Sequence, residues 1–231
     1  MIINAVTQRG SGKNNSEDRI LIGNRILCNE GLSGEVQPCV IGIADGVGGN
    51  AGGDIAAHFV CEKLSKCALD ADSFAAVNSA LLEFARMTRG KESMASTFSG
   101  IFPGGKILHI GNTRIYAIQG GYLKQLTEDM TTYNYLLSLG RLEEAENCAK
   151  NEITACFGGG NSSLFKPIIA DRLLSGKIVI TSDGVHDYVD LDSLEDTITS
   201  SDDDFSACHR IVQSAIDNGS DDDLSVVIVK F

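Results

Sequence analysis

Two apolar stretches of the sequence end on the same three residues, Asp-Gly-Val. CVIGIADGVGG reaches its aspartate at Asp45, and KIVITSDGV reaches its own at Asp183. Each aspartate stands at the carboxyl end of an expected buried strand. Three further acids stand at strand starts: Glu17 and Asp18 precede RILIG, and Asp222 precedes LSVVIV. In antiparallel neighbours the end of one strand lies beside the start of the next, so these acids could converge on one edge of a sheet.

Such a cluster of carboxylates predicts a divalent metal site. Four or five acids cannot stay ionised together without cations, because like charges raise one another's pKa. Mg²⁺ and Mn²⁺ prefer oxygen ligands and are the natural counter-ions. The glycine after each aspartate lets the backbone bend sharply and could bring a carbonyl, such as that of Gly46, within reach of an ion. An isolated Asp-Gly is usually only a turn, so the prediction depends on the joint placement of the acids.

Length, charge and cysteine content narrow the class of protein. The 231 residues fit one large domain, and the net charge of −12 argues against nucleic-acid and anionic-membrane partners, which need basic surface. No apolar run approaches the roughly 20 residues of a membrane span, and the N-terminal segment has no apolar stretch of signal-peptide length. The seven cysteines contain no C-x-x-C pair, which favours reduced thiols in a cytoplasmic protein and disfavours zinc.

Hydrophobic periodicity and turn residues predict an α+β domain. Two helices are expected in succession over 52–88, with no strand between them, and this does not fit a strict βαβ alternation. Antiparallel hairpins are expected over 95–126. The layered α+β class is therefore favoured over a doubly wound parallel sheet. The remaining expected elements are strands at 2–8, 19–23, 38–44, 177–182 and 224–231, and helices over 131–150 and 204–217.

A dinucleotide-binding loop is a competing interpretation of one of these segments. Residues 46–51 satisfy G-x-G-x-x-[GA] between an expected strand and an expected helix. However, Asp45 would direct a negative charge at a pyrophosphate. The chain is also still expected to be helical at 63–68, where an acid should end a second strand. This alternative is the weaker one, because a lone glycine fingerprint is permissive.

Eight motifs, in order, resemble those of the PP2C (PPM) family of metal-dependent protein serine/threonine phosphatases, with DGVGG closest to the bacterial members. They are KNNSED (13–18), ADGVGG (44–49), ASTFSG (95–100), GNTRIY (111–116), QLTED (125–129), NEITACFG (151–158), ITSDGVHD (180–187) and DDLSVVIV (222–229). They span nearly the whole chain, so the resemblance implies a single phosphatase domain over residues 1–231. It also implies a four-layer αββα sandwich, two antiparallel β-sheets flanked by helix pairs, with a two-metal site at one edge.

The resemblance assigns roles to individual residues. Two Mn²⁺ or Mg²⁺ ions would activate the water that hydrolyses phosphoserine or phosphothreonine. Asp45 would bridge the two ions. The Gly46 carbonyl and Glu17 would complete the ligands of one ion, and Asp183 and Asp222 would hold the other.

Two further roles follow from the same resemblance, together with a place in the cell. Asp18 would act through bound water, and Lys13 would contact the substrate phosphate. The partners would be phosphorylated proteins, the targets of a serine/threonine kinase, in the cytoplasm. Specificity is expected in the loop at 158–166 and the segment before it. His186, after the second DGV, could suggest a general acid, but alternation along the chain favours an ordinary polar role.

Four positions depart from the family pattern. Lys13 replaces an arginine that grips phosphate, and a lysine lacks the bidentate fork, so weaker substrate binding is expected. Asn112 replaces the acid that binds a third ion in bacterial members, which makes a third ion doubtful. Asp223 replaces an asparagine and adds a negative charge, and Met130 replaces a histidine. Lys13 and Asn112 keep open the alternative of a catalytically weak, phosphatase-like regulatory domain that binds phosphoproteins.

Overall fold

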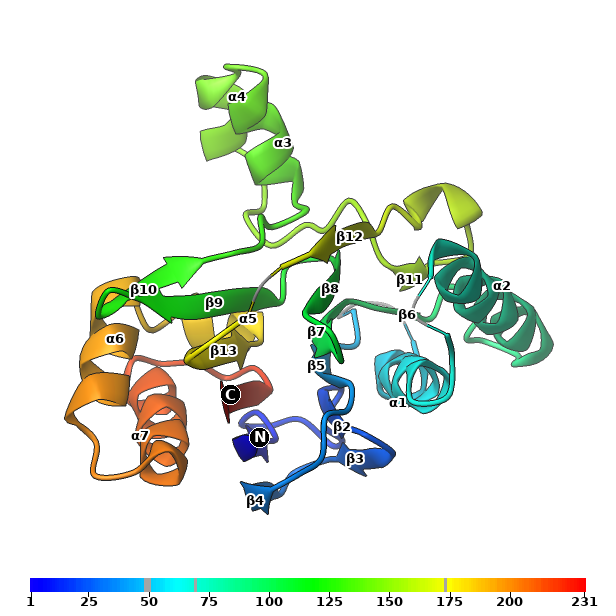
Figure 1. Cartoon of the computed structure of the whole chain (residues 1–231). Coiled ribbons are helices and arrows are strands. Elements are labelled where there is room, and N and C mark those ends of the chain that lie inside the picture. Colours follow the sequence, from blue (N-terminus) through cyan, green and yellow to red (C-terminus); the bar gives the residue numbers. More distant parts are fainter. Residues whose placement is uncertain (48–50, 69, 173) are drawn as a thin grey trace.

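Two six-stranded antiparallel β-sheets form the centre of the molecule (Figure 1). The structure is a computed structural model, and it describes residues 1–47, 51–68, 70–172 and 174–231. The first sheet has the strand order β10 (Tyr122–Gln125), β9 (Arg114–Gln119), β13 (Lys177–Thr181), β14 (Leu224–Lys230), β1 (Ile2–Gln8) and β4 (Gly31–Glu35). The second has the order β12 (Ile168–Asp171), β8 (Lys106–Ile110), β7 (Phe98–Phe102), β5 (Ile41–Ala44), β2 (Arg19–Ile22) and β3 (Arg25–Leu27). A small sheet pairs β6 (Ala95–Ser96) with β11 (Phe157–Gly158).

Strand alternation gives each large sheet two apolar faces. In β14, Val227 and Val229 belong to the apolar core shared by the two sheets, whereas Val226 and Ile228 pack on the helical side. In β2, Leu21 packs on its helical side and its two neighbours enter the shared core. Successive side chains of a strand point to opposite faces, so strands buried on both faces read as continuous apolar runs.

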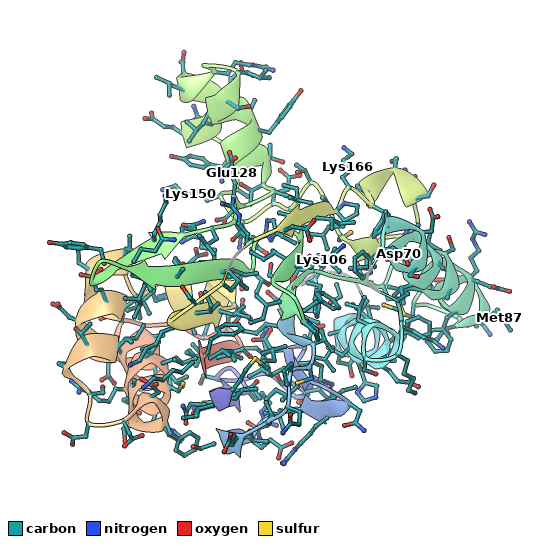
Figure 2. All side chains as sticks on the ribbon, viewed as in Figure 1. Asp70, Met87, Lys106, Glu128, Lys150 and Lys166 are labelled. Atoms are coloured by element: carbon teal, nitrogen blue, oxygen red, sulfur yellow. The ribbon has the colours of Figure 1, made fainter. Side chains whose placement is uncertain are left out.

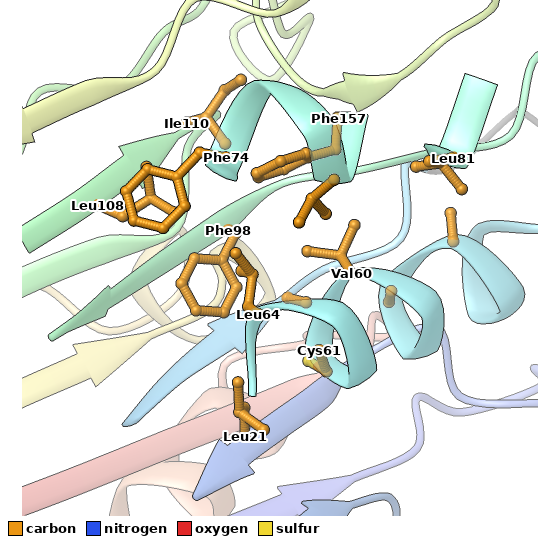
Figure 3. Close-up of a cluster of buried hydrophobic side chains, with 14 of the residues drawn as sticks. Leu21, Val60, Cys61, Leu64, Phe74, Leu81, Phe98, Leu108, Ile110 and Phe157 are labelled. Atoms are coloured by element: carbon orange, nitrogen blue, oxygen red, sulfur yellow. The ribbon is translucent and has the colours of Figure 1, made fainter. Parts of the chain in front are cut away.

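Helix pairs cover the outer faces of the sheets. Helices α1 (Gly53–Leu64) and α2 (Ala71–Met87) pack on the second sheet, and α6 (Leu191–Ser200) and α7 (Asp204–Asp217) pack on the first (Figure 1). The buried side chains between the α1–α2 pair and its sheet include Val60, Phe74, Phe98 and Phe157 (Figure 3). The expected four-layer αββα architecture is therefore confirmed.

Two short helices project from the body of the molecule. Helices α3 (Thr132–Ser138) and α4 (Leu142–Glu146) extend beyond the sheets, with Glu128 and Lys150 near their base (Figures 1 and 2). The expected helix over 131–150 is thus divided, and Gly140, with a φ of 72°, lies in the turn between its two halves. Helix α3 contributes no buried residue.

Several elements differ from the expectations. The strand expected at 38–44 begins only at Ile41, and helix α7 matches its expected bounds. Strands β3, β4 and β12 and helices α5 (Asp183–His186) and α6 were not expected, because their sequences are short or polar. A 3-10 turn (Ser162–Leu164) interrupts the expected loop at 158–166. All seven cysteines are free thiols. Among the described residues, no helix is both long enough and apolar enough to span a membrane.

Strands β5 and β7 approach each other closely at two glycines. Gly42 and Gly100 are register partners. A Cβ atom on Gly42 would lie 2.6 Å from Cζ of Phe98 and 2.7 Å from the Ser99 carbonyl oxygen. Any side chain at Gly42 would therefore displace either the Phe98 ring or the neighbouring strand.

We expect Gly42→Ala to lower the free energy of unfolding by about 1–3 kcal/mol, the usual cost of overpacking. The matched control is Gly34→Ala in β4, where no described atom lies within 4 Å of the added Cβ, and its stability should stay within about 0.5 kcal/mol of the wild type. Urea denaturation of the two variants measures the difference. Equal midpoints would show that the Phe98 ring gives way without cost.

Candidate active site

The acids of the second sheet meet because β2 and β5 are antiparallel neighbours. Arg19 pairs with Ala44 in their register. Asp18, just before β2, and Asp45, just after β5, therefore lie at the same end of this strand pair. Glu17 precedes Asp18, and its carbonyl oxygen accepts a hydrogen bond from the amide of the residue after Asp45, at 3.2 Å.

The acids of the first sheet meet in the same way. Thr181 of β13 pairs with Val226 of β14, so that Asp183 and Asp222 lie at the same end of those strands. The two acid pairs thus belong to different sheets. The expectation that all these acids would converge on the edge of one sheet is wrong. The acids gather where the ends of two stacked sheets meet. Antiparallel pairing explains how the acids of one sheet come together, but not how the two pairs meet.

A pocket of about 580 Å³ opens at this junction. Four of the predicted acids line it, together with Lys13, Gly46 and residues of neighbouring segments. The full lining is Lys13, Glu17, Asp45, Gly46, Val47, Thr97, Asn112, Asn151, Glu152, Ile153, Asp183 and Asp222. Asp18 lies behind the wall, with 1% of its surface exposed. Every residue predicted for the site is therefore at the pocket or directly behind it.

Hydrogen bonds with Ser96 and Thr97 hold the backbone of Asp45 in place. The Asp45 carbonyl oxygen accepts hydrogen bonds from the Thr97 amide at 2.8 Å and the Ser96 hydroxyl at 3.1 Å. Its amide donates to Oγ1 of Thr97 at 3.2 Å, and that oxygen shares a hydrogen bond with Oγ1 of Thr113 at 2.8 Å. The carboxyl group is thus held in the pocket by a rigid support.

The glycines of the two Asp-Gly pairs lie where a side chain would not fit. A Cβ on Gly46 would lie 2.4 Å from the backbone of Gly53, and a Cβ on Gly53 would lie 2.5 Å from Oε1 of Glu17. A Cβ on Gly184 would lie 2.1 Å from the Asp223 carbonyl oxygen. Neither Gly46 nor Gly184 has a positive φ. Lack of room for a side chain explains both glycines, and neither needs a left-handed backbone.

Burial and mutual repulsion raise the pKa of the central acids. Burial raises the pKa of Asp45 well above its usual range, and the charges of Asp183 and Asp18 raise it further. Burial also raises the pKa of Asp183, with the charge of Asp222 adding to the effect. For Glu17, burial raises the pKa and Lys13 opposes the shift. The pocket therefore disfavours the ionised form of these acids unless cations are supplied.

Asp18 is the clearest sign of a missing partner. Both of its carboxylate oxygens are buried, and neither has a hydrogen bond of normal geometry within the described residues. The hydroxyls of Ser182 and Ser225 lie nearby, but they bond to the Asp223 carbonyl oxygen and to Thr7. Buried polar groups without partners are uncommon, and they indicate an absent ion or water.

Two neighbours already compensate part of the negative charge. The Lys13 ammonium contacts Oδ1 of Asp222 and lies 3.0 Å from Oδ2 of Asp223. Nδ2 of Asn112 donates to Oδ2 of Asp183 at 2.8 Å. Among the described residues, no three histidine, cysteine, aspartate or glutamate side chains form a closed metal-binding group. The donors nevertheless suit a hard divalent cation, because they are all oxygens and include an unpartnered buried carboxylate.

The pocket also contains residues that the sequence did not assign individually to the site. Asn151, Glu152 and Ile153 line the pocket, whereas the loop at 158–166 is absent from its lining. The segment before that loop was expected to contribute, and the NEITACFG motif (151–158) was the available signal. His186 does not line the pocket; it is 7% exposed and its Nδ1 shares a 2.8 Å hydrogen bond with Thr181.

The dinucleotide-binding alternative finds no support in the topology. Strand β5 is bonded to two antiparallel neighbours, β2 and β7, and is not the first strand of a parallel βαβ unit. Residues 48–50, which belong both to that fingerprint and to the DGVGG motif, lie outside the described residues.

Comparison with characterised proteins connects this geometry with one enzyme class. No family model matches the chain. It is 27% identical over 240 residues to the serine/threonine protein phosphatase PstP of Mycobacterium tuberculosis, covering 97% of this chain and 44% of that protein. The chain thus spans less than half the length of that relative. It is also 27% identical over 250 residues to the protein phosphatase PhpP of Streptococcus pneumoniae, covering 99% of this chain and 97% of that protein.

Solved structures share the same architecture. The crystal structure of the M. tuberculosis phosphatase PstP/Ppp superimposes with a TM-score of 0.80 at 24% identity, over 100% of both chains. The catalytic domain of PstP, in complex with two manganese ions, gives a TM-score of 0.77 at 25% identity and covers 99% of this chain and 98% of that one. This chain is similar to the bacterial PPM serine/threonine phosphatases and has their fold.

The PPM-type fold explains how the four departures from the family motifs are accommodated. Asn112 bonds to Asp183, and Lys13 bonds to Asp223, so three of the altered positions make contacts inside the site. Met130 makes two hydrogen bonds with Gly111: its amide donates to the Gly111 carbonyl oxygen at 2.8 Å, and its Sδ accepts one from the Gly111 amide at 3.5 Å.

We expect Asp45→Asn to raise the melting temperature of the metal-free protein by at least about 2–4 °C, the shift that corresponds to roughly 1 kcal/mol in a chain of this size. Asparagine has nearly the same shape as aspartate and removes a charge that the crowded pocket disfavours. The folded-state pKa of Asp45 is raised, so its penalty grows as pH rises above the unfolded-state value of about 3.9 and should disappear below that value.

Thermal melts of chelator-treated protein between pH 4 and pH 8 measure this effect. Asp221→Asn is the matched control, because Asp221 is exposed in the same acidic loop and does not line the pocket. A lower melting temperature for Asp45→Asn at pH 7 would mean that the carboxylate supports the turn and is not under repulsion.

Proposed function

We propose that this chain is a metal-dependent protein serine/threonine phosphatase that uses two Mn²⁺ or Mg²⁺ ions. One observation carries the proposal: acids from two different sheets gather in one pocket, and behind them both buried carboxylate oxygens of Asp18 lack a hydrogen-bond partner among the described residues. The similarity to named bacterial serine/threonine phosphatases, one of them described in complex with two manganese ions, supports it. On this proposal, residues 1–231 act as one phosphatase domain.

The proposed metal ligands follow the family pattern. Asp45 would help to hold both ions, Glu17 and the Gly46 carbonyl would help to hold one of them, and Asp183 and Asp222 would help to hold the other. All five residues line the pocket. Gly46, Gly53 and Glu17 are packed too closely for any side chain on either glycine, which keeps the Gly46 backbone and the Glu17 carboxylate together.

The bound ions would lower the pKa of a water molecule and offset the charge of the phosphoryl group. The protein's own residues hold the parts in place. The carboxylate of Asp18, buried behind the ligands, would accept hydrogen bonds from bound water and orient it. Lys13 brings a positive charge to the pocket wall, where a phosphoryl oxygen of the substrate would lie. No histidine is among the described residues that line the pocket, so water would protonate the leaving seryl or threonyl oxygen.

The proposed substrates are phosphoproteins modified by a serine/threonine kinase in the cytoplasm. The names of the relatives support the substrate class, and seven free thiols suit a reducing compartment. The alternative of a weakly active phosphoprotein-binding domain is disfavoured by the same relatives, since those named are phosphatases.

We expect hydrolysis of p-nitrophenyl phosphate and of phosphopeptides that depends on Mn²⁺ or Mg²⁺ and stops with chelator. Asp183→Asn should lower the rate at saturating Mn²⁺ at least about 100-fold, because the charge that holds an ion is lost. Steady-state kinetics across a Mn²⁺ titration measures this. The control, Asp221→Asn, removes the same charge from a nearby exposed position and should leave the rate within about twofold.

Full activity of Asp183→Asn at saturating Mn²⁺ would reject the ligand assignment. A wild type that binds Mn²⁺ and phosphopeptide without turnover would instead favour the regulatory domain.

We further expect Asn112→Asp to create or strengthen a third ion site. Asn112 now donates a hydrogen bond to Asp183, whereas an aspartate would offer an anionic oxygen, which a hard dication binds far better. Equilibrium dialysis should show additional Mn²⁺ bound per chain, and less Mn²⁺ should be needed for half-maximal rate. Asn151→Asp, a second pocket-lining amide, is the matched control for added charge. An equal effect of both variants would point to general electrostatics and not to a third site.

A further inference from the structure

The N-terminal loop that carries Glu17 lies directly on the loop that carries Asp222. A Cβ on Gly10 would lie 2.3 Å from the Asp221 carbonyl oxygen and 2.6 Å from the carbonyl carbon of Asp222. Such a close approach needs a specific attachment, because the two loops come from opposite ends of the chain.

Asp223 provides this attachment with its side chain. Oδ1 accepts a hydrogen bond from the Gly10 amide at 2.9 Å, and Oδ2 accepts one from the Glu17 amide at 2.8 Å. Both ends of the loop are therefore held by one carboxylate. The side chain of Asp223 is only 2% exposed, so these are buried, charge-assisted hydrogen bonds.

Asp223 also holds the neighbouring proposed ligand through its backbone. Its amide donates to Oδ1 of Asp222 at 2.7 Å. Asp223 thus bonds both to the backbone of Glu17 and to the carboxylate of Asp222, which are proposed ligands of different metal ions.

Lys13 supplies the charge that a buried carboxylate needs. Its ammonium lies 3.0 Å from Oδ2 of Asp223 and also contacts Asp222. No other lysine or arginine within the described ranges forms an ion pair with Asp223.

We propose that Lys13 and Asp223 form a positioning pair that sets the distance between Glu17 and Asp222. The identity of those two residues as metal ligands rests on the proposed function; the pair itself does not. Lys13 and Asp223 are two of the departures from the family motifs, and the pair links them. The extra negative charge of Asp223 is neutralised by a lysine that is long enough to contact it. An ammonium has three N–H donors, and two are taken here, which leaves one for a phosphoryl oxygen.

A double-mutant cycle tests the pair in the metal-free protein. Lys13→Met leaves a buried carboxylate without its counter-ion, and Asp223→Asn places an amide NH₂ against one of the surrounding donors. Each substitution should raise the unfolding equilibrium constant at least about tenfold. In the double variant the increase should be at least about fivefold smaller than the product of the two single increases. Lys13→Arg keeps the charge and should restore most of the stability lost in Lys13→Met.

Mn²⁺ binding by calorimetry tests the positioning role. The double variant Lys13→Met/Asp223→Asn has the same net charge as the wild type, so a weaker affinity cannot arise from net charge. We expect its dissociation constant for Mn²⁺ to rise at least about tenfold, because the Glu17 loop is no longer held. The control is Lys66→Met/Glu62→Gln, which removes an exposed ion pair of α1 and its following turn and should bind Mn²⁺ like the wild type.

Independent effects of the two substitutions on unfolding would overturn the pair. Wild-type Mn²⁺ affinity in the double variant would overturn the positioning role, as would Lys13→Met raising only the KM for phosphopeptide. A wild type that binds no Mn²⁺ would contradict the proposed function instead, while the unfolding cycle would still decide whether Lys13 and Asp223 act together.

Discussion

The crowding of carboxylates at the junction of two sheets is the constraint on which the rest of this structure depends. Burial and like charge raise the pKa of Asp45, Asp183 and Asp18, so the folded chain keeps acids where their ionised forms are disfavoured. A protein with an ordinary core would gain stability by replacing them. Their presence is understandable if cations complete the site, and the all-oxygen donor set suits Mn²⁺ or Mg²⁺.

The fold brings these acids together at the ends of strands, because Asp45 and Asp183 closely follow a strand and Asp18 immediately precedes one. Asp45 and Asp183 follow central strands of two stacked sheets, and the apolar core between the sheets fixes the separation of the strand ends. Helix pairs on both outer faces bury the opposite sides of the same strands. The glycines beside the acids allow backbones to touch, as at Gly46 and Gly184, so the pocket wall is dense and its geometry is well defined.

A hydrogen bond and an ion pair offset part of the negative charge of the site. Asn112 donates to Asp183, and Lys13 lies between Asp222 and Asp223. Each contact lowers the repulsion in the metal-free protein, and each involves a position where the chain departs from the family motifs. A change at Lys13 or Asp223 is therefore expected to require a change at the other, since a buried charge without a counter-ion is costly.

The sequence by itself determined the chemistry of the site and the order of the main elements. Apolar runs that stop at Asp45 and Asp183, and acids placed just before other strands, were enough to predict a divalent metal site, because strand ends are local features. Only the tertiary structure decided that the two halves of the site come from different sheets, since no short segment of sequence specifies which strands pair or how the sheets stack. It also decided why the glycines are there, which depends on the backbone packed against them, that of Gly53 for Gly46 and that of Asp223 for Gly184. The bonds from Asp223 to Gly10, Lys13 and Glu17 join residues more than 200 positions apart, and only the folded chain brings them into contact.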